Sequence, residues 1–289
     1  MDTFATYDLH LHTEWSYDAL AKVEDYFKMA RERKTRAIAI TDHHLMDGYG
    51  DVQKCHEKYP DVHFFAGGEL TVHCPLGTFD LVCLNLPMQF TPELEELWKT
   101  YRAWQVSYGH ALSVFITGKG YPFDDDARYK LLQTYRAPHI LAIQGNSHIR
   151  YDTMCKECIR LGMYKDAKEF RQFYSSLTNM PNYPEYDYVV PIVKRAGGVV
   201  IIAHPYDYFE HDNLKRMDEL REMLQLDGIE CAHPSIPEAA TDFYRDYCVK
   251  HGLLSSGGSD LHQGPYDDFA KLYCKDAWLD EIIERVKMY

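Results

Sequence analysis

The sequence lacks the features of several protein classes. None of its apolar runs reaches the roughly 20 residues that a membrane-spanning helix needs, and its start does not combine charge with an apolar core as an export signal does. We therefore expect a cytoplasmic protein. Basic residues are few, with 31 Lys and Arg against 44 Asp and Glu and a net charge of -13, so long nucleic acid is not an expected partner.

Closely paired cysteines are also scarce. The eight cysteines are scattered through the chain, several of them inside apolar runs, and this pattern does not predict a disulfide framework. Cys155 and Cys158 form a single Cys-x-x-Cys, but a zinc ribbon needs a second pair. A redox or zinc role for this pair is therefore only a secondary hypothesis.

The 289 residues contain short apolar segments rich in β-branched or aromatic residues, a composition typical of buried strands. Seven are found, at residues 7–11, 37–41, 63–66, 79–84, 199–203, 228–231 and 253–256. Helix-like stretches at 21–33, 218–226 and 237–250 lie between several of them. This alternation predicts an α/β fold with a parallel sheet, in a barrel or doubly wound arrangement.

The alternation stops between residues 91 and 190, where no convincing strand is found. Helix-favouring runs at 93–108, 151–161 and 167–177 are separated there by turn signals. We expect residues 1–90 and 191–289 to form the main domain, closed by a helix at 277–288. Residues 91–190 would then be a mostly helical insertion that forms a lid or side wall.

Imidazoles and carboxylates follow or lie in nearly every predicted strand. Because the carboxyl ends of parallel strands share one edge, these side chains are expected to converge there. The candidate metal ligands are His10, His12, Asp18, His43, Glu69, Asp80, His204, Asp260 and His262. Alone, each could be a structural or capping residue. Together they exceed what one ion uses, so we expect two or three divalent ions, with Glu69 as the bridge.

The ordered motifs resemble those of the polymerase and histidinol phosphatase (PHP) family of metal-dependent phosphoesterases. The motifs are Asp-Leu-His-Leu-His at 8–12, Thr-Asp-His at 41–43, Gly-Glu at 68–69, Ala-His-Pro at 203–205 and Gly-Ser-Asp-Leu-His at 258–262. The resemblance implies a distorted seven-stranded (β/α)7 TIM-like barrel with a trinuclear site of Mn, Zn or Fe. It assigns His10, His12, Glu69 and Asp260 to one ion, Glu69 and His204 to a second, and Asp18, His43 and His262 to a third.

A closer resemblance concerns the branch of the family that removes phosphate from nucleotides and short oligoribonucleotides. Asn-Ser-His-Ile-Arg at 146–150 is similar to a segment of that branch, as is the stretch with Glu230 and His233. The resemblance implies that Arg150 clamps a substrate phosphate, and that His148 contacts this group or protonates the leaving oxygen. His233 is the third candidate for substrate binding, and His148 and Glu69 are the candidate catalytic residues.

Three positions depart from the pattern of that branch, and one of them is Ile236, which falls where another His often lies near the substrate. Asp80 stands where a His is common, eleven residues after Glu69, and His44 stands where an acidic residue is frequent. A carboxylate at position 80 is a harder ligand and favours manganese or iron.

The preferred hypothesis is a metal-dependent phosphoesterase that attacks a small phosphorylated substrate with metal-bound hydroxide. The substrate would be a nucleotide or the end of a short oligonucleotide. Histidinol phosphate and sugar phosphates are alternative substrates. An amidohydrolase acting on a carbon centre and a metal-stabilised accessory domain remain open as alternative functions. The oligomeric state is not predicted.

Overall fold

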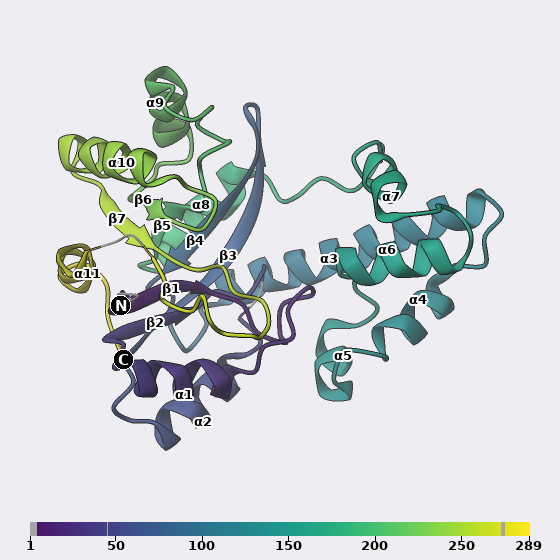
Figure 1. The fold of residues 1–289 in the computed structure, drawn as a ribbon, viewed down its shortest axis with the longest axis horizontal. Coiled ribbons are helices and arrows are strands. Elements are labelled where there is room, and N and C mark those ends of the chain that lie inside the picture. The colour runs from purple at the N-terminus through teal and green to yellow at the C-terminus, as the bar shows by residue number, and fades with distance from the viewer. Residues whose placement is uncertain (1–4, 45, 273–274) are drawn as a thin grey trace.

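The computed structural model describes residues 5–44, 46–272 and 275–289 (Figure 1). Its seven strands are β1 (Tyr7–Leu11), β2 (Ala37–Ile40), β3 (Phe64–Cys74), β4 (Gly77–Leu84), β5 (Val199–Ile202), β6 (Gly228–Ala232) and β7 (Leu254–Gly257). All seven predicted segments are thus strands. The one large difference in length is β3, which continues eight residues beyond the predicted end at residue 66.

The seven strands form one curved sheet in chain order. Hydrogen bonds between its two ends nearly close it into a barrel: the backbone amide of Asp260 donates to the carbonyl of His10 at 2.9 Å, and that of His12 donates to Leu261 at 2.9 Å. The predicted α/β barrel of seven strands is therefore confirmed in its main features.

Strand β4 breaks the predicted parallel arrangement. It runs antiparallel to both β3 and β5, whereas the other neighbouring strands pair in parallel. The reason lies in the Pro75-Leu76-Gly77 turn, where Gly77 has φ +134°, a conformation that side chains rarely tolerate. This turn joins β3 to β4 as a hairpin, so the expectation of strict strand and helix alternation is wrong at this point.

Helices pack around the barrel (Figure 1). They are α1 (Val23–Arg33), α2 (Tyr49–Lys58), α8 (Tyr186–Arg195), α9 (Leu214–Met223), α10 (Glu238–His251) and α11 (Asp276–Ile283). In α1 the buried residues Val23, Phe27 and Ala30 recur at helical spacing and form the face turned to the sheet. The helix ends at Lys34, whose φ of 56° is left-handed.

Five helices lie between β4 and α8: α3 (Pro92–Gly118), α4 (Asp125–Leu132), α5 (Pro138–Gln144), α6 (Tyr151–Arg160) and α7 (Ala167–Tyr174). The first part of α3 buries Leu97 and Trp98 in the core of the barrel. Its far end contributes Ile116 to a second hydrophobic cluster, made with residues such as Phe123 and Phe170. Helix α3 therefore connects two cores, and α4 to α7 gather around its far end in Figure 1.

The structure also bears on the predicted absences. Seven cysteines of the described residues are free thiols, while Cys274 lies outside the described residues. In the part of the chain that the structure describes, no helix combines the length and apolar character needed to cross a membrane.

Candidate metal centre

Two histidines at the end of β1 point into the same space at the carboxyl edge of the barrel. His10 lies on β1 and His12 comes directly after its last residue, and both side chains are fully buried. The buried carboxylate of Asp8 accepts hydrogen bonds from the amide of Ser259 at 2.9 Å and its hydroxyl at 2.6 Å. These bonds tie the loop after β7, which carries Asp260 and His262, to β1, which carries His10 and is followed directly by His12.

Glu69 lies at the centre of the cluster. Its Oε2 is 3.3 Å from Nε2 of both His10 and His12, and 2.9 Å from Nδ1 of His43. Its other oxygen, Oε1, is 3.1 Å from Nε2 of His204. One carboxylate thus faces four imidazoles from three separate segments of the chain, as a ligand shared between two ions would.

Asp260 lies beside the same pair of histidines. Its Oδ1 is 3.0 Å from Nε2 of His12 and 3.5 Å from Nε2 of His10. His10, His12, Glu69 and Asp260 therefore form one contiguous group of potential ligand atoms.

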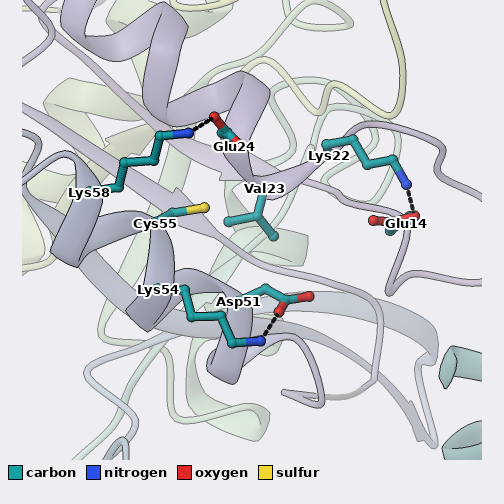
Figure 2. A pocket seen from close by; sticks show the side chains of 8 residues that line it. All are labelled: Glu14, Lys22, Val23, Glu24, Asp51, Lys54, Cys55 and Lys58. Carbon is teal, nitrogen blue, oxygen red and sulfur yellow. Dashed lines mark hydrogen bonds and ion pairs between the residues drawn. The ribbon is translucent and has the colours of Figure 1, made fainter.

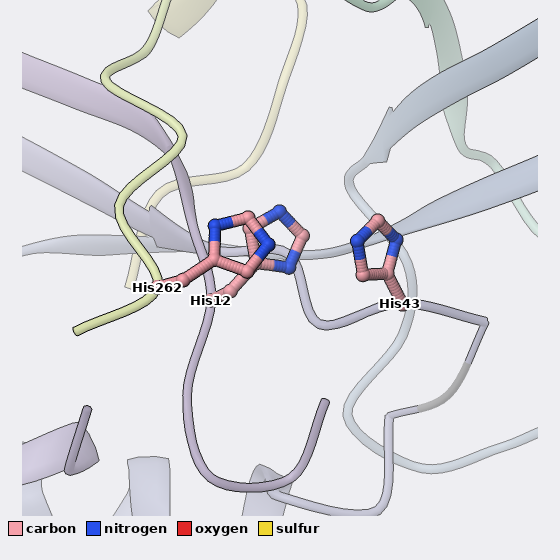
Figure 3. Close-up of side chains that lie close together, drawn as sticks. All are labelled: His12, His43 and His262. Carbon is pink, nitrogen blue, oxygen red and sulfur yellow. The ribbon is translucent and has the colours of Figure 1, made fainter. Parts of the chain in front are cut away.

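A second group contains Asp18, His43 and His262. The Oδ2 atom of Asp18 is 3.4 Å from Nε2 of His43 and 3.4 Å from Nε2 of His262. Figure 3 shows how His12 lies between the other two rings, with centroids 4.3 Å from each. Nitrogen atoms of these three histidines lie within 4.8 Å of one another, a spacing that one ion could bridge.

The third group joins Glu69, Asp80 and His204, whose ligand atoms also lie within 4.8 Å of one another. Asp80 comes from β4 and His204 from the end of β5. The Oδ2 atom of Asp80 is 3.9 Å from Nε2 of His204. All nine predicted metal ligands therefore lie in the three adjoining groups.

In His10, His12 and His262 the outer nitrogen, Nδ1, forms a hydrogen bond away from the cluster, and the inner nitrogen, Nε2, faces the other candidate ligands. His10 uses Nδ1 for Oε1 of Glu230 at 3.0 Å, and His262 uses Nδ1 for the carbonyl of Asp260 at 2.8 Å. The hydroxyl of Ser16 donates to Asp42 and so accepts from Nδ1 of His12 at 3.1 Å. Each outer bond accepts the proton of Nδ1, so Nε2 is the nitrogen that can offer a lone pair to a metal once its own proton is displaced.

Several buried polar atoms in the cluster have no hydrogen-bond partner in the described residues. They are His10 Nε2, His12 Nε2, Asp18 Oδ1, His43 Nδ1, Glu69 Oε2 and His233 Nε2. Such atoms are costly to bury unless something else satisfies them. Because they are imidazole nitrogens and carboxylate oxygens that face one another, the residues fit divalent metal ions.

The electrostatics of the cluster also favour cations. Burial disfavours a charge on Glu69, but the nearby His10 and His43 outweigh it and hold the pKa of this carboxyl well below its usual range. Burial likewise opposes protonation of His10, yet Glu69 and Glu230 raise its pKa well above the ordinary value. The pocket therefore stabilises positive charge at the place where the bare nitrogens converge.

Glu230 is a functional residue whose role sequence reasoning did not identify. Besides accepting from His10, its Oε2 accepts from the backbone amide of His204 at 2.6 Å. One carboxylate thus orients two potential ligands from separate parts of the sheet, His10 on β1 and His204 after β5. The signal available in the sequence was its position at the end of a strand, but its partners depend on the closed barrel.

The three candidate substrate residues lie around the cluster. Nε2 of His233 is 3.5 Å from Oδ2 of Asp260. Arg150 lies beside the loop after β7, where its Nη1 is 3.5 Å from Oε1 of Gln263. Among the described residues its ion-pair partner is Asp152, with Nη2 3.8 Å from Oδ2. These are weak contacts, so most of the guanidinium's donor capacity is available to a ligand.

His148 is buried against Tyr17, the neighbour of Asp18 in sequence, with ring centroids 3.8 Å apart. Neither of its ring nitrogens has a hydrogen-bond partner in the described residues. Burial lowers its pKa to about 3, although Asp18 opposes this shift. The ring is therefore neutral near pH 7 in this conformation and is not a standing proton donor.

A cavity of about 310 Å³ lies away from this cluster, between the start of α1 and α2 (Figure 2). Three lysines line it, and each contacts a carboxylate: Lys22 contacts Glu14, Lys54 contacts Asp51 and Lys58 contacts Glu24. Its charges are matched in pairs, so it does not offer the unpaired ligand atoms found at the barrel edge.

A barrel whose carboxyl edge gathers bare imidazole nitrogens and carboxylate oxygens defines a metal-dependent hydrolase. The family profile of the PHP domain matches residues 8–236, and the chain belongs to this family. Site and family together make the protein a hydrolase that acts on phosphoesters.

Solved structures of similar fold support the architecture. A protein from Bifidobacterium adolescentis, assigned as a metal-dependent phosphoesterase, is 21% identical with a TM-score of 0.75, covering 97% of this chain and 96% of that chain. An amidohydrolase from Chromobacterium violaceum, solved with bound sulfate and no metal, is 20% identical with a TM-score of 0.74, covering 97% of each chain. Among curated proteins no match is found.

Proposed function

We propose that the protein is a phosphatase that removes phosphate from a nucleotide or from the end of a short oligonucleotide. The observation that carries the proposal is the convergence of unpartnered imidazole and carboxylate atoms beside a guanidinium with weak partners, Arg150. An arginine fork binds a phosphate through two parallel hydrogen bonds.

Two or three ions of Mn, Zn or Fe are proposed for the three groups of ligands. His10, His12, Glu69 and Asp260 would hold one ion, Glu69 with His204 and Asp80 a second, and Asp18 with His43 and His262 a third. When bound, such ions supply Lewis-acid charge and lower the pKa of a coordinated water towards neutrality.

The chain's own residues would bind and orient the phosphate. Arg150 would clamp two of its oxygens and keep phosphorus in line with the ligand cluster. His233, which already lies beside Asp260, would contact the same group. The neutral ring of His148 would offer one N–H donor to the phosphate or the leaving oxygen, which is the contact role rather than the proton-donor role.

Residues 91–190 are proposed to form the lid or side wall of the site. This segment supplies His148 and Arg150, and Trp104 and Tyr108 of α3 pack around His148 with centroids at 5.5 and 5.0 Å. These contacts support a role for the insertion in deciding which leaving group fits.

The test is hydrolysis by purified protein loaded with Mn²⁺. Phosphate release is compared among nucleoside monophosphates, bisphosphate nucleotides, short oligonucleotides, sugar phosphates and histidinol phosphate, with a lactone and an amide alongside. We expect nucleotides to be hydrolysed fastest. Fastest hydrolysis of an aliphatic phosphate would contradict the substrate class, and metal-loaded protein without any hydrolysis would indicate an accessory domain.

The variant Arg150→Ala tests the phosphate clamp. We expect kcat/KM for the best phosphoester to fall about 100-fold, because the guanidinium acts where charge collects. Arg160→Ala is the matched control, since Arg160 lies on the same helix, is exposed and pairs with Glu157. Full phosphoester activity in Arg150→Ala, or turnover of the lactone or amide alone, would favour an amidohydrolase instead.

A further inference from the structure

Two hydroxyl groups hold the carboxylate of Asp80. Thr71 Oγ1 donates to its Oδ1 at 2.6 Å, and the hydroxyl of Tyr208 donates to its Oδ2 at 2.6 Å. The backbone of Asp80 is fixed as well, because Thr71 is its register partner on β3 and its carbonyl accepts from Ala203 on the other side. Oδ2 keeps a free lone pair towards the groups of His204 and Glu69.

The hydrogen bonds around Thr71 can run in only one direction. An ionised carboxylate only accepts, so the single hydroxyl hydrogen of Thr71 belongs to Asp80. Thr71 must then accept from Nε2 of His44 at 2.9 Å, which leaves Nδ1 of His44 to accept from the amide of Gln105 at 3.4 Å. A chain of four side chains thus runs from helix α3 of the insertion to Asp80.

The chain is rigid because its central member is enclosed. His44 is 1% exposed, stacks parallel to Tyr101 with centroids 5.1 Å apart, and meets Trp104 edge-on at 5.1 Å. Tyr101 in turn donates from its hydroxyl to the backbone carbonyl of Thr71 at 2.8 Å.

The same chain joins two of the three positions that depart from the resembled pattern. An imidazole is common at position 80 and an acidic group at position 44, and this sequence carries the two residue types exchanged. Thr71 lies between them and bonds to both. The hydroxyl of Thr71, which accepts from His44, is therefore oriented to donate to the carboxylate at position 80.

We infer that Thr71, Tyr208 and His44 are positioning residues that fix Asp80 as an oxygen ligand of the ion shared by Glu69 and His204, and that this position selects Mn²⁺ over Zn²⁺. The inference rests on the proposed metal site. Two carboxylates and one imidazole form a harder ligand set than one rich in nitrogen, which favours Mn²⁺. Partners of this kind set metal affinity without touching the ion.

The experiment titrates metal-free full-length protein with Mn²⁺ and follows the electron paramagnetic resonance signal of the free ion. We expect Thr71→Val and Tyr208→Phe to weaken one class of Mn²⁺ site about 10-fold or more while the remaining sites keep their affinity. Thr71→Ser keeps the hydroxyl and should bind as the wild type does. Tyr206→Phe is the control for Tyr208, because the ring of Tyr206 stacks on His211.

Competition with Zn²⁺ tests the selectivity. We expect Asp80→His to shift the preference of this one site towards Zn²⁺. The inference is overturned if Thr71→Val and Tyr208→Phe, with wild-type circular dichroism, bind every Mn²⁺ equivalent as tightly as the wild type. If Thr71→Val does not fold, Tyr208→Phe decides alone. No phosphoester enters this titration. A protein that hydrolyses none of the tested substrates would therefore contradict the proposed function without changing the conclusion drawn from the Mn²⁺ affinities of the variants.

Discussion

Replacing Gly258 by alanine tests whether the loop after β7 and strand β1 are as closely packed as the metal centre requires. A Cβ at position 258 would lie 2.0 Å from Cβ of His10, 2.7 Å from its backbone nitrogen and 2.9 Å from Oε1 of Glu230. The first two atoms belong to a strand in the barrel wall, so they cannot rotate away as the end of a flexible side chain could.

The expected cost follows from these distances. The two Cβ atoms would have to separate from 2.0 Å to the 3.4 Å of ordinary contact, which moves β1 away from the loop. Overpacking of this kind costs about 1–3 kcal/mol of unfolding free energy, and the upper end applies here because backbone must shift. His10 would also lose its alignment with Glu69 and Glu230, so Mn²⁺ affinity should fall about 10-fold or more.

The assay is urea denaturation in the presence of chelator, followed by Mn²⁺ titration of the same protein. Gly50→Ala is the control: nothing lies within 4 Å of a Cβ there, and the residue is in helix α2, so stability should change by at most about +1 kcal/mol. If Gly258→Ala unfolded within about 0.5 kcal/mol of the wild type and bound Mn²⁺ equally well, the proposed packing would be refuted.

Changes at Glu230, at Arg136 and in pH test other contacts around the centre. In Glu230→Gln an amide would face the backbone N–H of His204, so calorimetric titration should give about 10-fold weaker Mn²⁺ binding, and unchanged affinity would contradict this role. Arg136 is buried and donates to backbone carbonyls of the β1–α1 loop, so Arg136→Met should cost about 2 kcal/mol or more in urea denaturation, whereas exposed Arg160→Met should cost under about 0.5. In metal-free protein, burial lowers the pKa of His204, but Glu69 outweighs burial and raises this pKa from 6.5 to about 9. The protonated imidazole therefore adds folding stability that is complete below pH 6.5 and is lost as the pH rises through 9. Mn²⁺ binding must displace that proton, so affinity should rise towards pH 9, and calorimetry in two buffers that detected no proton release would contradict this.

The strand segments were predictable because each is a short apolar run bounded by polar residues. Their direction was harder. The segment at 79–84 carries the same composition whether it runs with or against its neighbours, and only the Pro75-Leu76-Gly77 turn indicated a hairpin. Since the predicted third strand ended at residue 66, Thr71 was not placed on a strand at all.

The convergence of the nine candidate ligands could be predicted because strand-end positions and a spacing of two residues follow from local sequence. Their supporting residues could not. Glu230 and Tyr208 act on His10 and Asp80 through contacts between segments far apart in the chain. Hydroxyls and single carboxylates are common in any sequence, so only the closed barrel distinguishes these from their neighbours.

The direction of β4 and the length of helix α3 are linked. Because β4 runs backwards, its first half, with Asp80, lies at the edge where parallel neighbours end, and its last residue pairs with the first residue of β5. The chain therefore leaves β4 at the edge opposite the metal centre. A helix of 27 residues, about 40 Å long, then carries it past the barrel, and Tyr101 and Gln105 reach Thr71 and His44 on the way. If β4 ran parallel to its neighbours, the segment after β4 would start at the edge that carries the candidate metal ligands, and no long helix along the barrel would be needed. The direction of β4 therefore explains why α3 is buried in both hydrophobic cores.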